Sequence, residues 1–230
     1  GTHLARAMKS QQVSITGLYN RTRERAKSLA EELDCNWTDK ISGLTKDADI
    51  YFICVRDDAI GEVAEELSQT LTSDLPVVHT SGVLSPNILA PYFKTYGGWY
   101  PLNSFSKDRP VTWRETPIFV NASDSDFELI LKEAARKLSA VVLNLEDHQR
   151  LPLHISAVFI NNFTNYLLRI SKDITEKNRL SLDYLLPLLK TTIEKALEED
   201  PDEVQTGPDA RDDKQTMEKH IRYLKEHHPE

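Results

Sequence analysis

A chain of 230 residues can form one large domain or two modest ones, and a hydrophobic fraction of 40% is enough for a core. The formal net charge of −8 argues against nucleic acid or an anionic membrane surface as the main partner. No apolar run reaches the roughly 18 residues that a membrane span needs. The two cysteines, Cys35 and Cys54, lack the spacing of a metal site, and we expect free thiols in a cytoplasmic protein.

The N-terminal part of the chain alternates between strand-like and helix-like patterns. A helix pattern with Ala26, Leu29, Ala30 and Leu33 at i, i+3, i+4 and i+7 follows the first expected strand. This alternation predicts an α/β fold with a doubly wound, mostly parallel sheet that helices cover on both faces. We expect strands at residues 13–18, 50–55, 76–79, 97–102, 116–120 and 140–145.

Three smaller features refine this picture of the N-terminal part. Asp57 and Asp58 could cap one helix, and the spacing of Ser125 and Glu128 predicts a capping box at the start of another. The residues after Gly1 have a helix-like pattern with no strand before them, which is an unusual start for this order of elements. We therefore expect the native protein to have residues upstream of Gly1.

Only helices are expected after Asp147. They cover residues 153–168, 182–199 with a kink at Pro187, and 213–227. The change of pattern places a domain boundary near Glu146, with an α/β domain at 1–146 and an all-α helical domain at 147–230.

The stretch 153–168 stands out because no charged residue occurs between Arg150 and Arg169. On a helix at ~100° per residue, His154, Asn161 and Asn165 fall within roughly 40° of one another, opposite a broad apolar face. We expect a helix that is buried nearly all round and aims neutral polar groups at a ligand. The alternative is a core helix whose polar groups bond to neighbouring backbone.

Polar residues at the ends of expected strands are candidates for cofactor binding. In a dinucleotide fold the end of the second strand meets the adenosine ribose, where Asn20, Arg21 and Thr22 stand instead of an acid. Arg21 could pair with a 2′-phosphate, which favours NADP over NAD. The alternative is an exposed arginine beside a helix cap.

Other strand ends suggest further contacts with a ligand. Val55, Arg56, Ser81 and Gly82 follow strands, and the carboxyl ends of parallel strands form the ligand crevice of an open α/β sheet. Ser81 and Gly82 suit the close approach of a cofactor ring, whereas we interpret His79 as structural. Gly1 could be the last glycine of a phosphate-binding turn at a helix N-terminus, or the helix could simply start there.

With these residues in view, the chain resembles a family of NADP oxidoreductases that have a Rossmann-like domain followed by a helical domain of uncharacterised function. The wider clan includes pyrroline-5-carboxylate reductase and the 6-phosphogluconate dehydrogenase-like enzymes. The motifs that carry the resemblance are Gly1 to Met8, Asn20-Arg21-Thr22, His79-Thr80-Ser81-Gly82, Tyr100-Pro101-Leu102, Leu153-His154 through Asn162-Phe163, and Thr206-Gly207-Pro208 with Arg211, Asp213 and His220.

The chain also departs from the pattern of the family. The first strand and the first two glycines of the phosphate-binding turn are missing, and Leu153 replaces a tyrosine. The clan's hydroxyacid dehydrogenases place a catalytic lysine on the central helix, but between Asp108 and Ala157 the only lysines, Lys132 and Lys137, belong to the preceding helix.

The resemblance implies hydride transfer between NADPH and a small carbonyl or imine substrate, with the cofactor at Gly1, Thr2 and the strand ends. The uncharged polar stripe and the motif match together suggest His154 as proton donor or polariser, with Asn162 and Asn165 orienting the substrate. Helical geometry favours Asn161 over Asn162, whereas the resemblance favours Asn162. Thr206, Gly207 and Arg211 would bind an anionic group of the substrate, with a partner subunit as one source, because the clan suggests a homodimer. The alternatives are a non-catalytic NADP(H)-binding or regulatory module, which the missing lysine favours, and a purely structural dimer.

Overall fold

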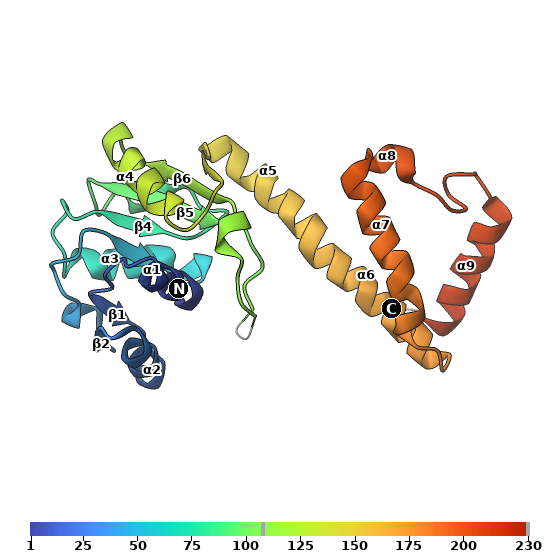
Figure 1. Cartoon of the computed structure of the whole chain (residues 1–230), viewed down its shortest axis with the longest axis horizontal. Helices are drawn as coiled ribbons and strands as arrows, with labels where there is room; N and C mark the ends of the chain where they lie inside the picture. The colour runs from blue at the N-terminus through green and yellow to red at the C-terminus, as the bar shows by residue number, and fades with distance from the viewer. Residues whose placement is uncertain (107–108, 229–230) are drawn as a thin grey trace. The chain divides into compact units, whose positions relative to one another are not determined.

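The structure is a computed structural model that describes residues 1–106 and 109–228 (Figure 1). The chain forms two compact units, Gly1–Val158 and Phe159–Glu230, called here the first and the second unit. Strands occur only up to Asn144 in the described residues, and the elements after it are helices, whereas the two units divide later, after Val158. The first of these helices, α5 (Asp147–Val158), counts with the first unit.

The first unit contains a five-stranded sheet and a separate strand pair. The sheet has the order β3 (Tyr51–Ile53), β4 (Val77–His79), β5 (Tyr96–Pro101), β6 (Ile118–Ala122) and β7 (Val142–Asn144). All of its pairs are parallel except β5 with β6, which run antiparallel. β1 (Gly17–Tyr19) pairs in parallel with β2 (Asn36–Thr38), a strand that the sequence analysis did not predict.

β1 is shorter than the sequence predicts. Val13 and Ile15 pack partly buried against the core, but the strand ladder begins only at Gly17. In the order 3-2-1-4-5-6 of a doubly wound sheet, the first strand lies between the second and the fourth. The corresponding position here is between β1 and β3, which belong to different sheets.

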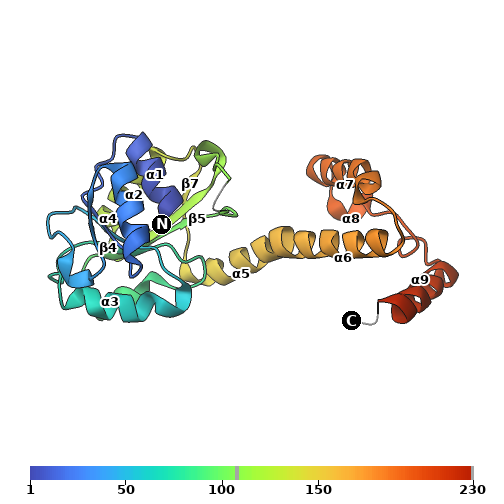
Figure 2. The ribbon, with the colours of Figure 1, turned by 90° about the horizontal axis from the view of Figure 1, so that it is seen from below.

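Helices pack on both faces of the five-stranded sheet, as expected. Successive strand residues point to opposite faces, and Val77 and Val78 accordingly belong to two different clusters of buried residues. One cluster joins the sheet to α1 (Thr2–Ser10) and α4 (Ser125–Arg136), and the other joins it to α3 (Ile60–Ser68). Figure 2 shows α1 above the strands and α3 below them. α2 (Arg23–Leu33) contacts β1 and β2.

Two predicted helix caps are wrong. α4 is capped by Asp124, whose side chain accepts a hydrogen bond from the Phe127 N–H at 2.9 Å, so Ser125 lies inside the helix. Asp57 and Asp58 lie in a short 3-10 helix, η2 (Asp57–Ala59), and make no side-chain cap bond to α3. In α4, Asp124 lies one residue before the predicted cap Ser125, and its carboxylate satisfies the free N–H groups of the first turn of α4 equally well.

The expected helix at residues 153–168 is interrupted. α5 ends at Val158, a π-helical turn follows at η5 (Phe159–Phe163), and α6 spans Thr164–Lys177. A π turn has a wider spacing than an α-helix, so the angular alignment expected for His154, Asn161 and Asn165 does not hold along the whole stretch.

The prediction that this stretch is buried nearly all round is wrong for the single chain. The side chains of its apolar face are exposed, with Ile160 at 76%, Leu167 at 62% and Phe159 at 61%. The missing charges had suggested a buried surface, but no described element of the second unit covers these side chains.

The second unit consists of helices only in its described residues. Pro187 occupies the first turn of α7, a position that needs no backbone N–H, so it starts the helix instead of kinking it. Nowhere in the described chain is a helix both long and apolar enough to cross a membrane. The remaining elements of the chain are η1 (Ile41–Gly43), η3 (Pro86–Leu89), η4 (Trp113–Glu115), η6 (Leu182–Leu185), α7 (Leu186–Glu198), α8 (Pro201–Val204) and α9 (Lys214–His227).

Candidate functional site

The candidate site lies at the carboxyl ends of the parallel strands β3, β4 and β5, which meet at one edge of the sheet. The N-terminus of α1 reaches the same edge. A Cβ atom on Gly1 would lie 3.1 Å from Cβ of Cys54, the residue after β3. The free N–H groups and the helix dipole of the first turn, at Gly1 and Thr2, therefore face this edge and favour an anion there.

The end of β1 presents an arginine that is free to bind a ligand. The side-chain oxygen of Asn20 accepts a hydrogen bond from the Thr22 N–H at 2.9 Å and so fixes the turn. Arg21 is exposed and forms no ion pair within residues 1–106 and 109–228. Its neighbour Arg23 instead lies over the Trp37 ring, 5.5 Å from the centroid. Thr22 precedes α2 without making a side-chain cap bond.

The residues after β3 are less available. Val55 is 39% exposed, and Nη2 of Arg56 lies 2.6 Å from Oδ2 of Asp58 in an exposed ion pair. Arg56 would have to leave this pair to reach a ligand, although exposed pairs of this kind are weak, at about 0–1 kcal/mol.

The loop after β4 is held tightly by its own side chains. His79 is fully buried, and its Nδ1 accepts a hydrogen bond from the Ser81 N–H at 3.2 Å. Burial lowers the pKa of His79 to about 4, so the ring is neutral at pH 7 and has a structural role, as expected. The hydroxyl oxygen of Ser81 accepts bonds from the N–H groups of Val83 at 3.1 Å and Leu84 at 3.0 Å.

Gly82 is required by its close approach to an aromatic ring. A Cβ atom at this position would lie 2.4 Å from Cζ of Tyr100, so any larger residue would displace the loop or the ring. Burial raises the pKa of Tyr100, whose hydroxyl therefore stays protonated at neutral pH. Ser81 and Gly82 are both buried and thus form a firmly packed turn at the end of β4.

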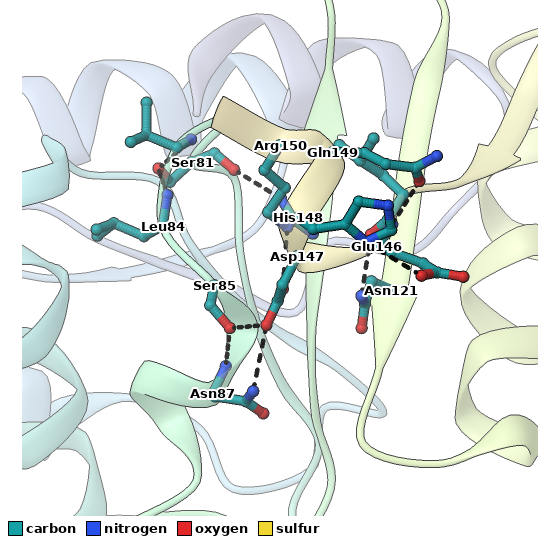
Figure 3. A network of polar contacts seen from close by, with 12 residues as sticks. Ser81, Leu84, Ser85, Asn87, Asn121, Glu146, Asp147, His148, Gln149 and Arg150 are labelled. Carbon is teal, nitrogen blue, oxygen red and sulfur yellow. Dashed lines mark hydrogen bonds and ion pairs between the residues drawn. The ribbon is translucent and has the colours of Figure 1, made fainter. Parts of the chain in front are cut away.

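A buried arginine, which the sequence analysis missed, completes the site (Figure 3). The side chain of Arg150 in α5 is only 1% exposed, and its Nη1 donates to the carbonyl oxygen of Ser81 at 3.3 Å. Its Nε lies 3.6 Å from Oδ1 of Asp147. A Cβ on Gly98 in β5 would lie 2.5 Å from Nη2, so only glycine leaves room for the guanidinium. The sequence does contain one sign of this close approach, because a glycine inside a strand often marks a place where another group lies close to the backbone.

His154 lies one helical turn beyond Arg150 on α5, so the two side chains share a face of the helix. Its Nδ1 is buried and has no hydrogen-bond partner in the described residues. Nε2 of the structural His79 is also buried without a partner in the described residues, so this feature alone does not assign a role to His154, which remains a candidate for binding a ligand atom.

The other candidate residues belong to the second unit. Asn162 lies in η5 and Asn165 in α6, and both are exposed. The Asn161 amide donates to Oδ1 of Asn162 at 3.1 Å, and the Asn165 amide donates to the Asn161 carbonyl at 3.0 Å. Asn161 is also exposed, so exposure does not favour one of the two neighbours. The described residues contain no group of three or more potential metal ligands.

The loop before α9 carries Thr206, Gly207 and Arg211. Gly207 has φ of 115°, a backbone conformation that favours glycine. Asp213 ends this loop and caps α9, because its side chain accepts a hydrogen bond from the Thr216 N–H at 3.1 Å. Part of the motif at 206–213 therefore has a local structural role.

Comparisons with known proteins place this architecture in a family. The family described as "Domain of unknown function (DUF2520)" matches residues 116–230. No curated protein matches the chain. Among solved structures, a candidate NADP oxidoreductase from Bacteroides fragilis is 32% identical with a TM-score of 0.89, over 98% of this chain and 87% of that protein.

Two more distant structures share the fold. A protein from Thermotoga maritima is 23% identical with a TM-score of 0.79, over 98% of this chain and 87% of its own. A pyrroline carboxylate reductase from Plasmodium falciparum, solved with NADP bound, is 14% identical with a TM-score of 0.63, over 97% and 88%. These matches confirm the predicted fold, a Rossmann-like sheet followed by helices. The chain belongs to the DUF2520 family.

Proposed function

We propose that the protein is an oxidoreductase that uses NADP(H) to transfer hydride to or from a small carbonyl or imine substrate. The observation that carries the proposal is the exposed Arg21, which forms no ion pair among the described residues and stands on a turn that Asn20 fixes at the end of β1. In a Rossmann-like fold an arginine there can bind a 2′-phosphate. The NADP oxidoreductase description of the 32% identical Bacteroides fragilis protein supports it.

The residues present fit such a cofactor along the carboxyl edge of the sheet. Gly1 and Thr2 would offer N–H groups to the pyrophosphate, and Asn20, Arg21 and Thr22 would surround the 2′-phosphate. The nicotinamide ring would lie against the packed turn at Ser81 and Gly82, beside Val55 and Arg56. When bound, the cofactor supplies the hydride chemistry, while the protein fixes geometry and charge.

The substrate residues follow from the chemistry that hydride transfer needs. Reduction of a carbonyl or imine requires a proton at the oxygen or nitrogen, and His154 is our candidate to donate it. Asn162 and Asn165 would orient the substrate through their amides. Thr206, Gly207 and Arg211 would bind an anionic group on it.

We also propose that the protein works as a homodimer, formed through the helices of the second unit. Large apolar side chains are exposed on η5, α6 and α7, including Ile160 at 76%, Leu188 at 65% and Leu197 at 82%. Exposed apolar surface of this extent marks an interaction site. A second copy carries the same helices and the same apolar pattern, so the surface is complementary to itself under two-fold symmetry.

The test is a calorimetric titration of the full-length protein with NADPH and then NADH. Loss of a charged phosphate contact costs about 1.5–3 kcal/mol, so Arg21→Ala should weaken NADPH binding by roughly 10- to 100-fold and leave NADH binding unchanged. Arg23→Ala is the matched control, because its side chain stacks on Trp37. Equal affinity of the unmodified protein for both cofactors would contradict the role of Arg21, and binding of neither would contradict the proposed function.

The rival function is a non-catalytic NADP(H)-binding or regulatory module, which the absence of a lysine from α5 favours. Such a protein would bind NADPH but would oxidise none of it in the presence of a panel of small carbonyl compounds and imines. If turnover is found, His154→Ala should lower it strongly while NADPH binding persists. Unchanged turnover of this variant would remove His154 from the mechanism.

A further inference from the structure

Arg150 is a buried cation whose position requires an explanation. Its side chain is 1% exposed, and Asp147 is its one acidic partner in the described residues, at 3.6 Å. Removing a charge from water costs several kcal/mol unless good pairing offsets it. The same burial lowers the pKa of Arg150 below its ordinary value, because a buried guanidinium loses part of its hydration. A residue that serves only stability would more cheaply be apolar.

The guanidinium joins three segments that are far apart in the sequence. Nη1 binds the carbonyl oxygen of Ser81, in the loop after β4. Nη2 lies against the backbone of β5, where a Cβ on Gly98 would approach within 2.5 Å. Nε faces Asp147, in the first turn of α5.

Asp147 extends the connection to the far end of the same loop (Figure 3). Its Oδ2 accepts hydrogen bonds from the Ser85 hydroxyl and, at 3.3 Å, from the Asn87 amide. Oδ1 of Asn87 in turn accepts from the Tyr96 hydroxyl at 3.0 Å. The loop between β4 and η3 is therefore attached to α5 at both ends, at Ser81 by Arg150 and at Ser85 by Asp147.

We propose that Arg150 is a positioning residue that, with Asp147, fixes the loop of residues 80–85 against the first turn of α5. This contact sets the surface on which the nicotinamide half of the cofactor rests. Because His154 lies one turn further along α5, the same contact holds the candidate proton donor relative to that surface. The role of the contact in cofactor binding rests on the proposed function, whereas the contact itself does not.

Lysine could not replace this arginine. The planar guanidinium donates Nη1 to the Ser81 carbonyl while Nε lies 3.6 Å from Asp147 and Nη2 lies against β5, although Nε and Nη2 make no hydrogen bond among the described residues. An ammonium is a compact point charge and cannot reach all three segments at once. The side chain also passes Gly98 in a space that leaves no room for a Cβ. Arg150→Lys should therefore behave like Arg150→Met.

The first experiment needs no cofactor. Amide hydrogen exchange is measured on the full-length protein and on Arg150→Met and Arg150→Lys, with the exposed Arg136→Met as control. We expect the amides of Val83, Leu84 and Asn87 to exchange at least about tenfold faster in both Arg150 variants, while those of Ile118 and Val120 in β6 keep their rates. Unchanged exchange in the loop, or an equal increase at β6, would overturn the proposal.

The second experiment separates the two halves of the cofactor site. NADPH carries the nicotinamide, whereas 2′,5′-ADP carries only the phosphorylated adenosine. Arg150→Met should weaken NADPH binding by about tenfold, equal to about 1.4 kcal/mol, and leave 2′,5′-ADP binding unchanged. Unchanged NADPH affinity, or an equal loss for both ligands, would overturn the cofactor role of Arg150. If the unmodified protein binds neither ligand, the proposed function fails, and hydrogen exchange still decides whether the contact holds the loop.

Discussion

The two units bury their apolar residues in very different ways. Every buried hydrophobic side chain among the described residues lies at or before Leu145, and all but Ala26, Ala30, Leu33 and Leu145 belong to the two clusters on the faces of the sheet. In the described part of the second unit, Thr175 alone is buried, although leucine, isoleucine and aromatic residues recur along its helices. The first unit has a core of its own, and the second unit does not.

The difference shows what each architecture requires. A sheet between two layers of helices buries both of its faces within one chain. An amphipathic helix buries its apolar side only when another element lies opposite. We propose that a second copy of the chain lies opposite the apolar sides of the helices in the second unit.

The largest expected effect of a single substitution lies in the core of the first unit. Leu131 on α4 is fully buried between α1 and the sheet, so Leu131→Ala should lower the free energy of unfolding by about 2–5 kcal/mol. Leu129 on the same helix is 57% exposed, and Leu129→Ala should change stability by no more than about 0.5 kcal/mol. Urea denaturation of the full-length protein measures both. Similar losses for the two variants would show that the core is not packed as described.

The sequence predicted most of the first unit because its signals are local. Continuous apolar runs such as residues 50–55 and helical spacings such as that of Ala26, Ala30 and Leu33 place the strands and helices close to their observed positions. β2 was missed because Asn36-Trp37-Thr38 is short and has no apolar run. Its strand character comes from its pairing with β1.

The site was less predictable because its geometry depends on residues distant in the sequence. Arg150 looks solvated in the sequence, and its burial depends on the space left by Gly98 and on the loop after β4. The uncharged stretch at 153–168 predicted a surface hidden from water, but a sequence pattern does not say which molecule covers it. The roles of His154, Asn162 and Arg211 remain predictions.

Breaking the proposed dimer should separate the behaviour of the two units. Ile160 is 76% exposed in the single chain, and a charge there would have to be buried at the interface. Ile160→Glu should weaken self-association by about 10- to 100-fold, equal to about 1.4–2.7 kcal/mol, as is common for residues central to an interface. Sedimentation equilibrium over a range of concentrations measures the effect.

The control for this variant is Leu129→Glu, which places the same charge on an exposed leucine of the first unit. It should leave association unchanged. A monomeric unmodified protein, or equal effects of the two substitutions, would contradict a dimer formed through the second unit. Lower thermal stability of Ile160→Glu at all concentrations, without any change in association, would contradict it as well.

The smallest expected effect comes from acidification, which acts on the first unit through His79. The pKa of His79 is about 4 in the folded protein against an ordinary value of 6.5, so between these values the unfolded chain binds more protons than the folded protein. Its contribution to stability is complete above pH 6.5 and is lost progressively as the pH falls towards 4. Between pH 7 and pH 5.5 the loss should be about 1 kcal/mol.

Urea denaturation at several pH values measures this loss, and His79→Asn should abolish it. The asparagine oxygen can still accept the Ser81 N–H that Nδ1 accepts, so the loop keeps that hydrogen bond. His148→Asn, a change of an exposed histidine, should keep the loss. Carboxylates such as Asp124, whose pKa is lowered by the Phe127 N–H, add their own loss only at lower pH. An identical pH dependence for His79→Asn and the unmodified protein would show that His79 is not held neutral by burial, and the loop after β4 would then be less closed than the structure shows.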